Sequence, residues 1–132
     1  MEPEHCEAPP RVLIVEDEWL IAMDLQDKLE EAGYCIVGPA PSVSAALGMI
    51  ARESLDAGLL DLHVGGESSY SVADALKRRS IPFAFLTGHS RADLDPEFQN
   101  EPLMCKPVSV DDLTTGLKVL LQWKRRCKSR PR

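Results

Sequence analysis

The sequence predicts an α/β fold in which a parallel sheet is covered by helices on both faces. Short runs of nearly uninterrupted apolar residues alternate with segments of helical periodicity along the chain. Strands that are buried on both faces give such continuous apolar runs, because helices cover each side of the sheet. The length of 132 residues, with 44% hydrophobic and 27% charged residues, suits one globular domain with its own core.

The first unit is a strand over residues 11–15 and a helix over residues 19–32. The strand is predicted by branched apolar residues that end abruptly at three acids. The helix is predicted by apolar residues at helical spacing, and Gly33 directly after it is a typical helix stop.

The second unit begins with a strand over residues 34–37, closed by Gly38 and Pro39. Ser42 is placed to cap a helix that ends near residue 52. The third unit is a strand over residues 56–61, a glycine-containing loop over 62–69 and a helix over 70–79.

The last two units are less regular. Residues 81–87 predict a strand, but residues 89–100 carry several charges and few apolar side chains, so we expect at most a short, poorly anchored helix there. Residues 103–106 predict the last strand. Ser109, with Asp112 three residues later, begins a helix that we expect to end near residue 124.

The charge and cysteine content restrict the function further. The formal net charge is −6, and residues 124–132 carry six basic residues and no acidic one, which leaves 9 bases against 21 acids, or −12, elsewhere. This balance argues against nucleic-acid binding by the main body. The absence of a signal peptide or an apolar span predicts a soluble cytoplasmic protein. Buried, reduced thiols are expected at all four cysteines, which are Cys6, Cys35, Cys105 and Cys127.

Polar residues that suit phosphate and metal chemistry follow four of the predicted strands. Glu16 and Asp17 follow the first strand and Asp61 ends the third, while Thr87 ends the fourth and Lys106 the fifth. The carboxyl ends of parallel strands share one edge, where ligands of such folds bind. Clustered carboxylates suit Mg²⁺ better than zinc, and a lysine and a hydroxyl can hold a transferring phosphoryl group.

Each of these residues also has an ordinary structural interpretation. Acids after a strand often serve only the start of a helix, and aspartate commonly ends a strand. A threonine at a strand end is usually a turn or cap residue, and a Lys-Pro pair is usually solvated. Only the combination across four strand ends favours a functional site.

Four segments make the chain resemble a two-component response-regulator receiver domain: V-L-I-V-E-D-E, L-L-D-L-H-V-G-G-E, F-L-T-G-H and C-K-P-V. The resemblance covers nearly all of residues 11–122. It implies a flavodoxin-like (βα)₅ fold with strand order 2-1-3-4-5 and a receiver domain over residues 11–123. Residues 1–10 are then a flexible arm and residues 124–132 a basic tail.

The resemblance also implies roles for individual residues. Asp61 is the implied phosphoacceptor, and Glu16 and Asp17 are implied to bind Mg²⁺ with Asp61 and the backbone carbonyl of His63. Thr87 matches the switch hydroxyl, and Lys106 matches the lysine that contacts the phosphoryl group. The bond from Lys106 to Pro107 is expected to be cis.

Two positions bear on how the switch works. The chain resembles a subgroup of stand-alone receivers, mainly alphaproteobacterial, with an F-A-T-G-x-Y-like fourth strand, and Gly88 in this motif would leave the phosphorylated site open. Leu103 stands where the family usually has an aromatic residue that rotates with the switch threonine. We therefore hypothesise that phosphorylation acts by ordering residues 89–100.

The resulting hypothesis is a single-domain response regulator that takes a phosphoryl group from a histidine kinase or phosphotransfer protein. It would signal by contact with a downstream protein or within a phosphorelay, as a monomer or weak dimer, without nucleic acid or membrane. It would not be a dedicated enzyme. A receiver-like module that is not phosphorylated remains an alternative. A Mg²⁺-dependent phosphatase with an aspartyl nucleophile is another, although His63 stands where such enzymes carry a second acid.

Overall fold

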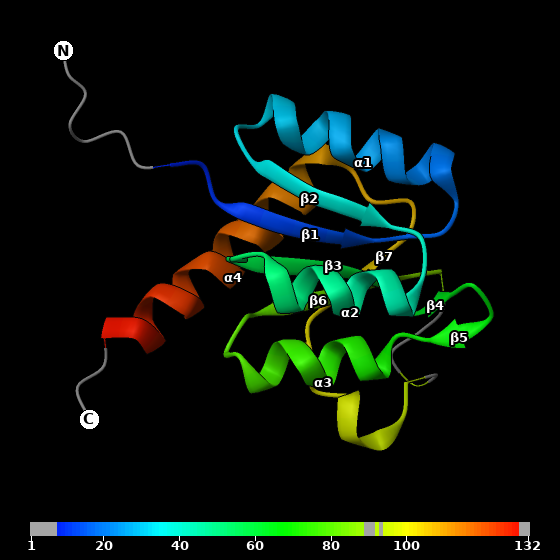
Figure 1. Cartoon of the computed structure of the whole chain (residues 1–132). Coiled ribbons are helices and arrows are strands. Elements are labelled where there is room, and N and C mark those ends of the chain that lie inside the picture. The colour runs from blue at the N-terminus through cyan, green and yellow to red at the C-terminus, as the bar shows by residue number, and fades with distance from the viewer. Residues whose placement is uncertain (1–7, 89–91, 93, 130–132) are drawn as a thin grey trace, which may run out of the picture.

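Five parallel strands form the central sheet of the computed structural model, which describes residues 8–88, 92 and 94–129, with side chains to residue 123. In spatial order they are β2 (Cys35–Ala40), β1 (Arg11–Val15), β3 (Ala57–Asp61), β6 (Phe83–Thr87) and β7 (Leu103–Cys105). Every neighbouring pair is parallel. The sequence-based α/β prediction and the strand order 2-1-3-4-5 implied by the resemblance are therefore confirmed, as Figure 1 shows.

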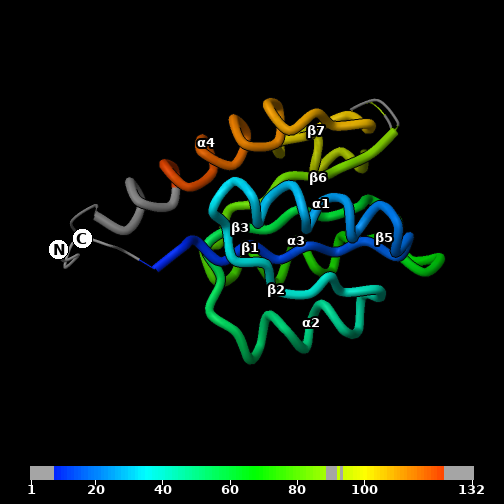
Figure 2. The backbone as a smooth tube through the Cα atoms, turned by 90° about the horizontal axis from the view of Figure 1, so that it is seen from above, coloured from blue at the N-terminus to red at the C-terminus, as the bar shows by residue number. Residues whose placement is uncertain are grey.

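Helices cover both faces of the sheet (Figure 2). Helices α1 (Trp19–Glu31) and α4 (Val110–Ser129) pack on one face, where Leu25, Leu29 and Leu117 are buried against the strands. Helices α2 (Val43–Arg52) and α3 (Tyr70–Arg78) pack on the other face. Because the central strands contact helices on both sides, residues 12–15 and 57–60 are all buried.

The predicted helix signals act as expected. The Ser42 hydroxyl accepts a hydrogen bond from the Ala45 N–H at 3.1 Å, and the Ser109 hydroxyl accepts one from the Asp112 N–H at 3.0 Å. Each bond satisfies a backbone donor that the first turn of a helix leaves without a partner. Gly33 has a φ of +100°, a conformation that glycine adopts without steric cost.

The strand β2 corrects the sequence-based prediction, because it does not end at Val37 but continues through Gly38 and Pro39 to Ala40. The pairing with β1 shifts register between Leu13 and Val15, so an irregularity absorbs the glycine and proline inside the strand. Gly38 has a φ of +97°, and a Cβ there would lie 2.7 Å from the Ala40 nitrogen. The bend leaves the Ala40 carbonyl to accept the Glu16 N–H at 3.0 Å.

The loop predicted after β3 contains a small hairpin. Strands β4 (His63–Val64) and β5 (Glu67–Ser68) pair antiparallel around Gly65 and Gly66. Both glycines have positive φ angles, +60° and +82°, which a two-residue hairpin turn with positive φ at both central positions requires. The hairpin lies beside the carboxyl end of β3.

The segment between β6 and β7 contains a 3₁₀ helix, Pro96–Phe98, which fits the expected short fourth helix. It is better anchored than predicted. Phe98 is 1% exposed and stacks on Tyr70 with ring centroids 4.4 Å apart, and the Tyr70 hydroxyl accepts the Asp95 N–H at 2.9 Å. The sequence alone did not predict that Phe98 anchors the segment, because its partner Tyr70 lies on α3. His89, and with it part of the 89–100 segment, lies outside the described residues.

Helix α4 extends to Ser129, five residues beyond its expected end, so most of the predicted basic tail continues the helix.

Cys35 and Cys105 are free but not buried, since Cys35 is half-buried and Cys105 is exposed at the end of the edge strand β7. Cys6, residues 1–7 of the predicted arm and residues 130–132 lie outside the described residues. Among the described helices, none combines the length and apolar character of a membrane span.

Candidate functional site

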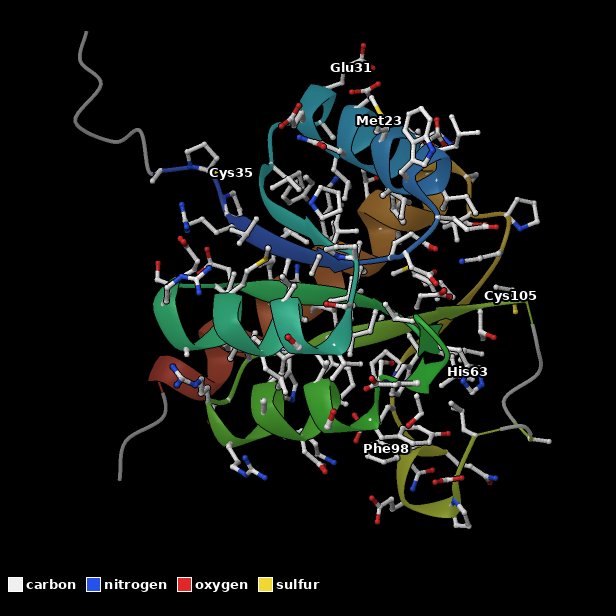
Figure 3. All side chains as sticks on the ribbon, turned by 45° about the vertical axis from the view of Figure 1, so that its right-hand side comes forward. Met23, Glu31, Cys35, His63, Phe98 and Cys105 are labelled. Carbon is white, nitrogen blue, oxygen red and sulfur yellow. The ribbon has the colours of Figure 1, made fainter. Side chains whose placement is uncertain are left out.

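Three carboxylates converge at the carboxyl end of the sheet. Glu16 and Asp17 directly follow β1, and Asp61 is the last residue of the adjacent strand β3. One oxygen from each of the three lies within 4.8 Å of the others. Figure 3 shows this end of the molecule on the right, where His63 and Cys105 lie, while Cys35 marks the opposite end. The parallel arrangement therefore brings together the acids that the sequence singled out.

Lys106 reaches the three carboxylates from the edge strand β7, which lies two strands away from β3 in the sheet. It directly follows β7, and its Nζ lies 2.8 Å from Glu16 Oε1 and 3.0 Å from Asp61 Oδ1. Its N–H donates to the Thr87 carbonyl at 2.8 Å, which holds the backbone against β6. The peptide bond between Lys106 and Pro107 is cis, as the resemblance implies.

Glu16 is the deepest of the acids, with 2% of the residue exposed. One of its carboxylate oxygens accepts from Lys106, and the other accepts from the Glu18 N–H at 3.1 Å. A buried carboxylate is tolerated when such donors replace water. Glu16 is therefore the fixed partner of Lys106. The other two acids, Asp17 and Asp61, are less buried and closer to solvent.

Asp17 is held by a residue that the sequence-based prediction did not single out. The Gly65 N–H, in the turn of the β4–β5 hairpin, donates to Asp17 Oδ2 at 2.9 Å. The V-G-G-E motif was part of the resemblance, but the pairing depends on the turn geometry. The backbone of this hairpin thus orients one of the three acids.

The electrostatics of the cluster follow from its burial and its mixture of charges. Burial raises the pKa of Asp61; the hydrogen bond from Lys106 lowers it in part, and the charges of Glu16 and Asp17 raise it. Burial lowers the pKa of Lys106, but its hydrogen bonds to Glu16 and Asp61 more than offset this, so its pKa is raised. The lysine stays a cation, and its charge does not fully compensate the acids.

The remaining predicted residues surround this cluster with different exposures. Thr87 ends β6 one residue beyond the Leu86 that pairs with Asp61, and it is 3% exposed. Gly88 is exposed, and a Cβ there would meet no atom of the described residues within 4 Å apart from its chain neighbours. His63 presents an exposed side chain, outside the group of three acids. Leu103 is half-buried in register with Phe85 and packs on the core that holds Phe98.

The donor set fits a hard divalent cation. Glu16, Asp17 and Asp61 supply only oxygen ligands. The single positive charge of Lys106 does not neutralise three carboxylates that repel one another. Mg²⁺ is bound in proteins by one or a few carboxylates and keeps several waters and phosphate oxygens as further ligands. The residues present therefore fit the ion that the sequence analysis expected.

Comparison with protein families identifies the class of protein that this fold and site define. The model of the response regulator receiver domain matches residues 12–118. The chain belongs to this receiver-domain family of two-component signalling.

Curated relatives are regulatory proteins. The transcriptional regulatory protein PdtaR of Mycobacterium tuberculosis is 33% identical over an alignment of 115 residues, which covers 84% of this chain and 56% of PdtaR. The phyllosphere-induced regulator PhyR of Methylorubrum extorquens is 33% identical over an alignment of 125 residues, which covers 90% of this chain and 46% of PhyR. This chain thus spans about half the length of the curated relatives it matches. Both relatives are named as regulators.

Solved structures give the same assignment. SdrG of Sphingomonas melonis Fr1 is 42% identical, with a TM-score of 0.76 over 88% of this chain and 99% of the SdrG chain. The response regulator PhyR of Brucella abortus is 28% identical, with a TM-score of 0.80 over 91% of this chain and 51% of PhyR. The first match spans nearly the whole of a relative that has the length of one receiver domain.

Proposed function

We propose that this chain is a response regulator whose receiver domain, residues 11–123, accepts a phosphoryl group on Asp61. The observation that carries the proposal is the contact of Lys106 Nζ with both Asp61 and Glu16, next to Asp17. This arrangement places the Asp61 carboxylate between the Lys106 cation and the two further acids, Glu16 and Asp17. The relative SdrG has been solved in a BeF₃-activated conformation, which supports the proposal by analogy because BeF₃ mimics a phosphoryl group.

The proposed reaction is a transfer between two side chains. An Asp61 oxygen attacks the phosphorus of a phosphohistidine, the new P–O bond forms, and the P–N bond breaks with its electron pair left on the imidazole nitrogen. Lys106 and the Thr87 hydroxyl hold oxygens of the transferred group. Mg²⁺, held by Glu16, Asp17, Asp61 and the carbonyl of His63, would supply further charge neutralisation.

The surface beside the cluster supports a protein as the donor. The first two turns of α1 expose three large apolar side chains, with exposures of 67% for Trp19, 69% for Leu20 and 49% for Met23. A groove of about 370 Å³ between α1 and residues 106–108 lies next to them and includes Lys106. Exposed apolar patches next to a reactive group typically mark contact surfaces. We propose that a kinase or phosphotransfer protein docks here, in the cytoplasm, and that a downstream protein receives the signal.

The test is incubation with acetyl phosphate and Mg²⁺ followed by intact-mass measurement. The proposal expects one added phosphoryl group in the native chain and none in Asp61→Asn. Asp27→Asn, on the exposed face of α1, is the matched control and should be labelled like the native chain. Steady release of phosphate from unrelated monoesters would instead indicate a phosphatase. A chain that neither gains mass nor releases phosphate would be an unphosphorylated interaction module.

A further inference from the structure

The small hairpin of β4 and β5 stands apart from the main sheet and contacts the acid cluster with its turn. Figure 1 shows both strands at the end of the sheet to which the strand arrows point. The Gly65 N–H, in the turn, donates to Asp17 Oδ2 at 2.9 Å. Because the two residues are 48 positions apart in sequence, this contact depends on the tertiary fold of the loop after β3.

Asp17 is held in a different way from the other two acids of the cluster. Lys106 forms ion pairs with Glu16 and with Asp61. Asp17 forms no ion pair within the described residues. It is also exposed, and the hydrogen bond from Gly65 is the only one that it accepts from the described part of the chain. An exposed carboxylate with a single donor gains rotamer freedom when that donor is displaced.

The base of the hairpin is closed inside the protein. Ser69, which directly follows β5, is 0% exposed, and its N–H and its hydroxyl both donate to the Leu62 carbonyl, at 2.9 and 3.2 Å. Val64, in β4, is 1% exposed and packs in the core. Since these contacts fix the two arms of the hairpin, the direction of the Gly65 N–H is set by the turn between them.

The turn requires positive φ angles at both of its central residues. Gly65 has a φ of +60° and Gly66 one of +82°, which is the pattern of a two-residue turn that matches the twist of its strands. A residue branched at Cβ is strongly disfavoured in this conformation, whereas asparagine adopts it readily. A Cβ on Gly65 would meet no atom of the described residues within 4 Å apart from its chain neighbours. A side chain at this position therefore changes the backbone preference without a clash.

We propose that the β4–β5 hairpin is a positioning element of the metal site, in which the Gly65 N–H holds Asp17 ready for Mg²⁺ and sets the affinity for the ion. Gly65 is then a positioning residue that acts through Asp17. The proposal rests on the proposed function, since it takes Asp17 as a ligand of Mg²⁺. It goes further because it makes the affinity depend on a backbone donor outside the acid cluster. Loss of a donor that orients a metal ligand typically weakens metal binding by about 10- to 100-fold.

The test is an NMR titration of the ¹⁵N-labelled full chain with MgCl₂ at constant ionic strength. Gly65→Val keeps a backbone N–H but disfavours the positive φ, and should weaken Mg²⁺ binding about tenfold. Gly66→Val, at the other central position of the turn, should act alike. Gly65→Asn adds a side chain at the same place but keeps the turn, and should bind within about twofold of the native chain.

Gly33→Val is the matched control for strain. Gly33 also has a positive φ, +100°, and an open position for a Cβ, but it lies at the far end of α1 from Asp17. This variant should bind Mg²⁺ as the native chain does. The contact itself is tested in EDTA with Asp17→Ala, in which the Gly65 amide signal should shift and exchange with solvent faster.

Several outcomes would overturn the proposal. Native affinity in Gly65→Val would show that the turn does not position Asp17, and so would an affinity in Gly65→Asn as weak as in Gly65→Val. An equal loss in Gly33→Val would assign the effect to general strain. An unshifted Gly65 amide in Asp17→Ala would remove the contact.

The proposed function is judged by a different result. At Mg²⁺ concentrations that saturate it, Gly65→Val should be labelled by acetyl phosphate like the native chain. A native chain that is labelled, with equal Mg²⁺ affinity in all the glycine variants, would sink the positioning role alone. A native chain that neither binds Mg²⁺ nor gains the phosphoryl mass would refute the proposed function itself.

Discussion

At the scale of single residues, one lysine among three acids sets the charge balance of the site. Two like charges about 4 Å apart repel by roughly 4 kcal/mol at an effective dielectric constant of 20. Lys106 compensates part of this repulsion through its contacts with Glu16 and Asp61. Burial raises the pKa of Asp61, and the charges of Glu16 and Asp17 add to this against the lowering by Lys106. The protein without metal therefore holds an acid cluster that costs folding stability and that a cation or phosphoryl ligand relieves.

The first prediction is that Asp61→Asn stabilises the protein in EDTA at neutral pH. Because the folded pKa of Asp61 lies above its ordinary value of 3.8, the folded state binds this proton more tightly than the unfolded state. Stability is therefore lost as pH rises from 3.8 through the folded pKa, and stays lost above it. Removing the charge should restore about 1 kcal/mol, or roughly 4 °C in melting temperature.

Thermal unfolding by circular dichroism measures this effect. The gain in Asp61→Asn should shrink as pH falls through the folded pKa and should vanish below 3.8, where the native carboxyl becomes protonated in both states. Asp27→Asn is the control, because its side chain is exposed on α1, and should leave the melting temperature unchanged. A lower melting temperature for Asp61→Asn in EDTA would contradict this account of the cluster.

The second prediction concerns Lys106→Met. This change leaves the carboxylate of Glu16, whose side chain is 1% exposed, without its cationic partner. We expect a loss of about 2 kcal/mol in the free energy of unfolding in EDTA, much of it recovered with Mg²⁺. Urea unfolding measures both values. Lys28→Met breaks an exposed pair with Asp24 and should change stability by less than about 0.5 kcal/mol; equal losses in both variants would refute the role of burial.

At the scale of elements, the segment before β7 depends on one aromatic contact rather than on a full helix. Phe98 is stacked on Tyr70 and lies edge-on to Phe85, with centroids 4.4 and 6.0 Å apart. Leu103 packs on the same core, so the position that is usually aromatic in the family is here next to an aromatic cluster. Thr87 ends β6, the strand that also carries Phe85. A conformational change that begins at Thr87 would therefore reach this aromatic cluster. The hypothesis that phosphorylation orders residues 89–100 stays a prediction, and within this segment Leu94 and Phe98 are already buried.

The third prediction separates the packing of Phe98 from the hydrogen bond of Tyr70. Phe98→Ala should cost about 3 kcal/mol, because it removes a buried ring. Tyr70→Phe keeps the stack but loses the hydroxyl that accepts the Asp95 N–H, and should cost about 1 kcal/mol. Amide exchange should accelerate over residues 94–101 in Phe98→Ala and mainly at Asp95 in Tyr70→Phe. Unchanged exchange in Phe98→Ala would show that the ring does not anchor the segment.

The fourth prediction tests the two helix caps that the sequence identified. Ser42→Ala and Ser109→Ala should each lower the free energy of unfolding by about 1 kcal/mol, since each leaves a first-turn N–H without its acceptor. Ser71→Ala, exposed within α3, serves as the reference in the same urea titration. Losses no larger than that of Ser71→Ala would mean that water replaces these caps at no cost.

Local patterns were sufficient for some elements and not for others. The strand β1 was predicted with its observed ends because an uninterrupted apolar run stops at three charges. The continuation of β2 past Pro39 could not be predicted, because the bulge depends on the pairing with β1. Phe98 appeared unanchored because its partner, Tyr70, is distant in sequence. The role of Gly65 likewise depends on the hairpin turn that aims its N–H at Asp17.

At the scale of the whole molecule, the parallel topology explains why the site could be predicted at all. Every strand of the sheet runs in the same direction, so residues that end separate strands meet at one edge. Glu16, Asp61 and Lys106 are far apart in sequence, yet they lie within contact distance of one another. The carboxyl end of the sheet thereby collects the acid cluster.

The most direct test of the central claim is to locate the phosphoryl group itself. After labelling with acetyl phosphate and Mg²⁺, borohydride reduces an aspartyl phosphate to homoserine, which peptide mass spectrometry locates. We expect homoserine at position 61 in the native chain and at no position in Asp61→Asn. Homoserine at Asp17 or another acid, or none in a chain that has gained the phosphoryl mass, would contradict it.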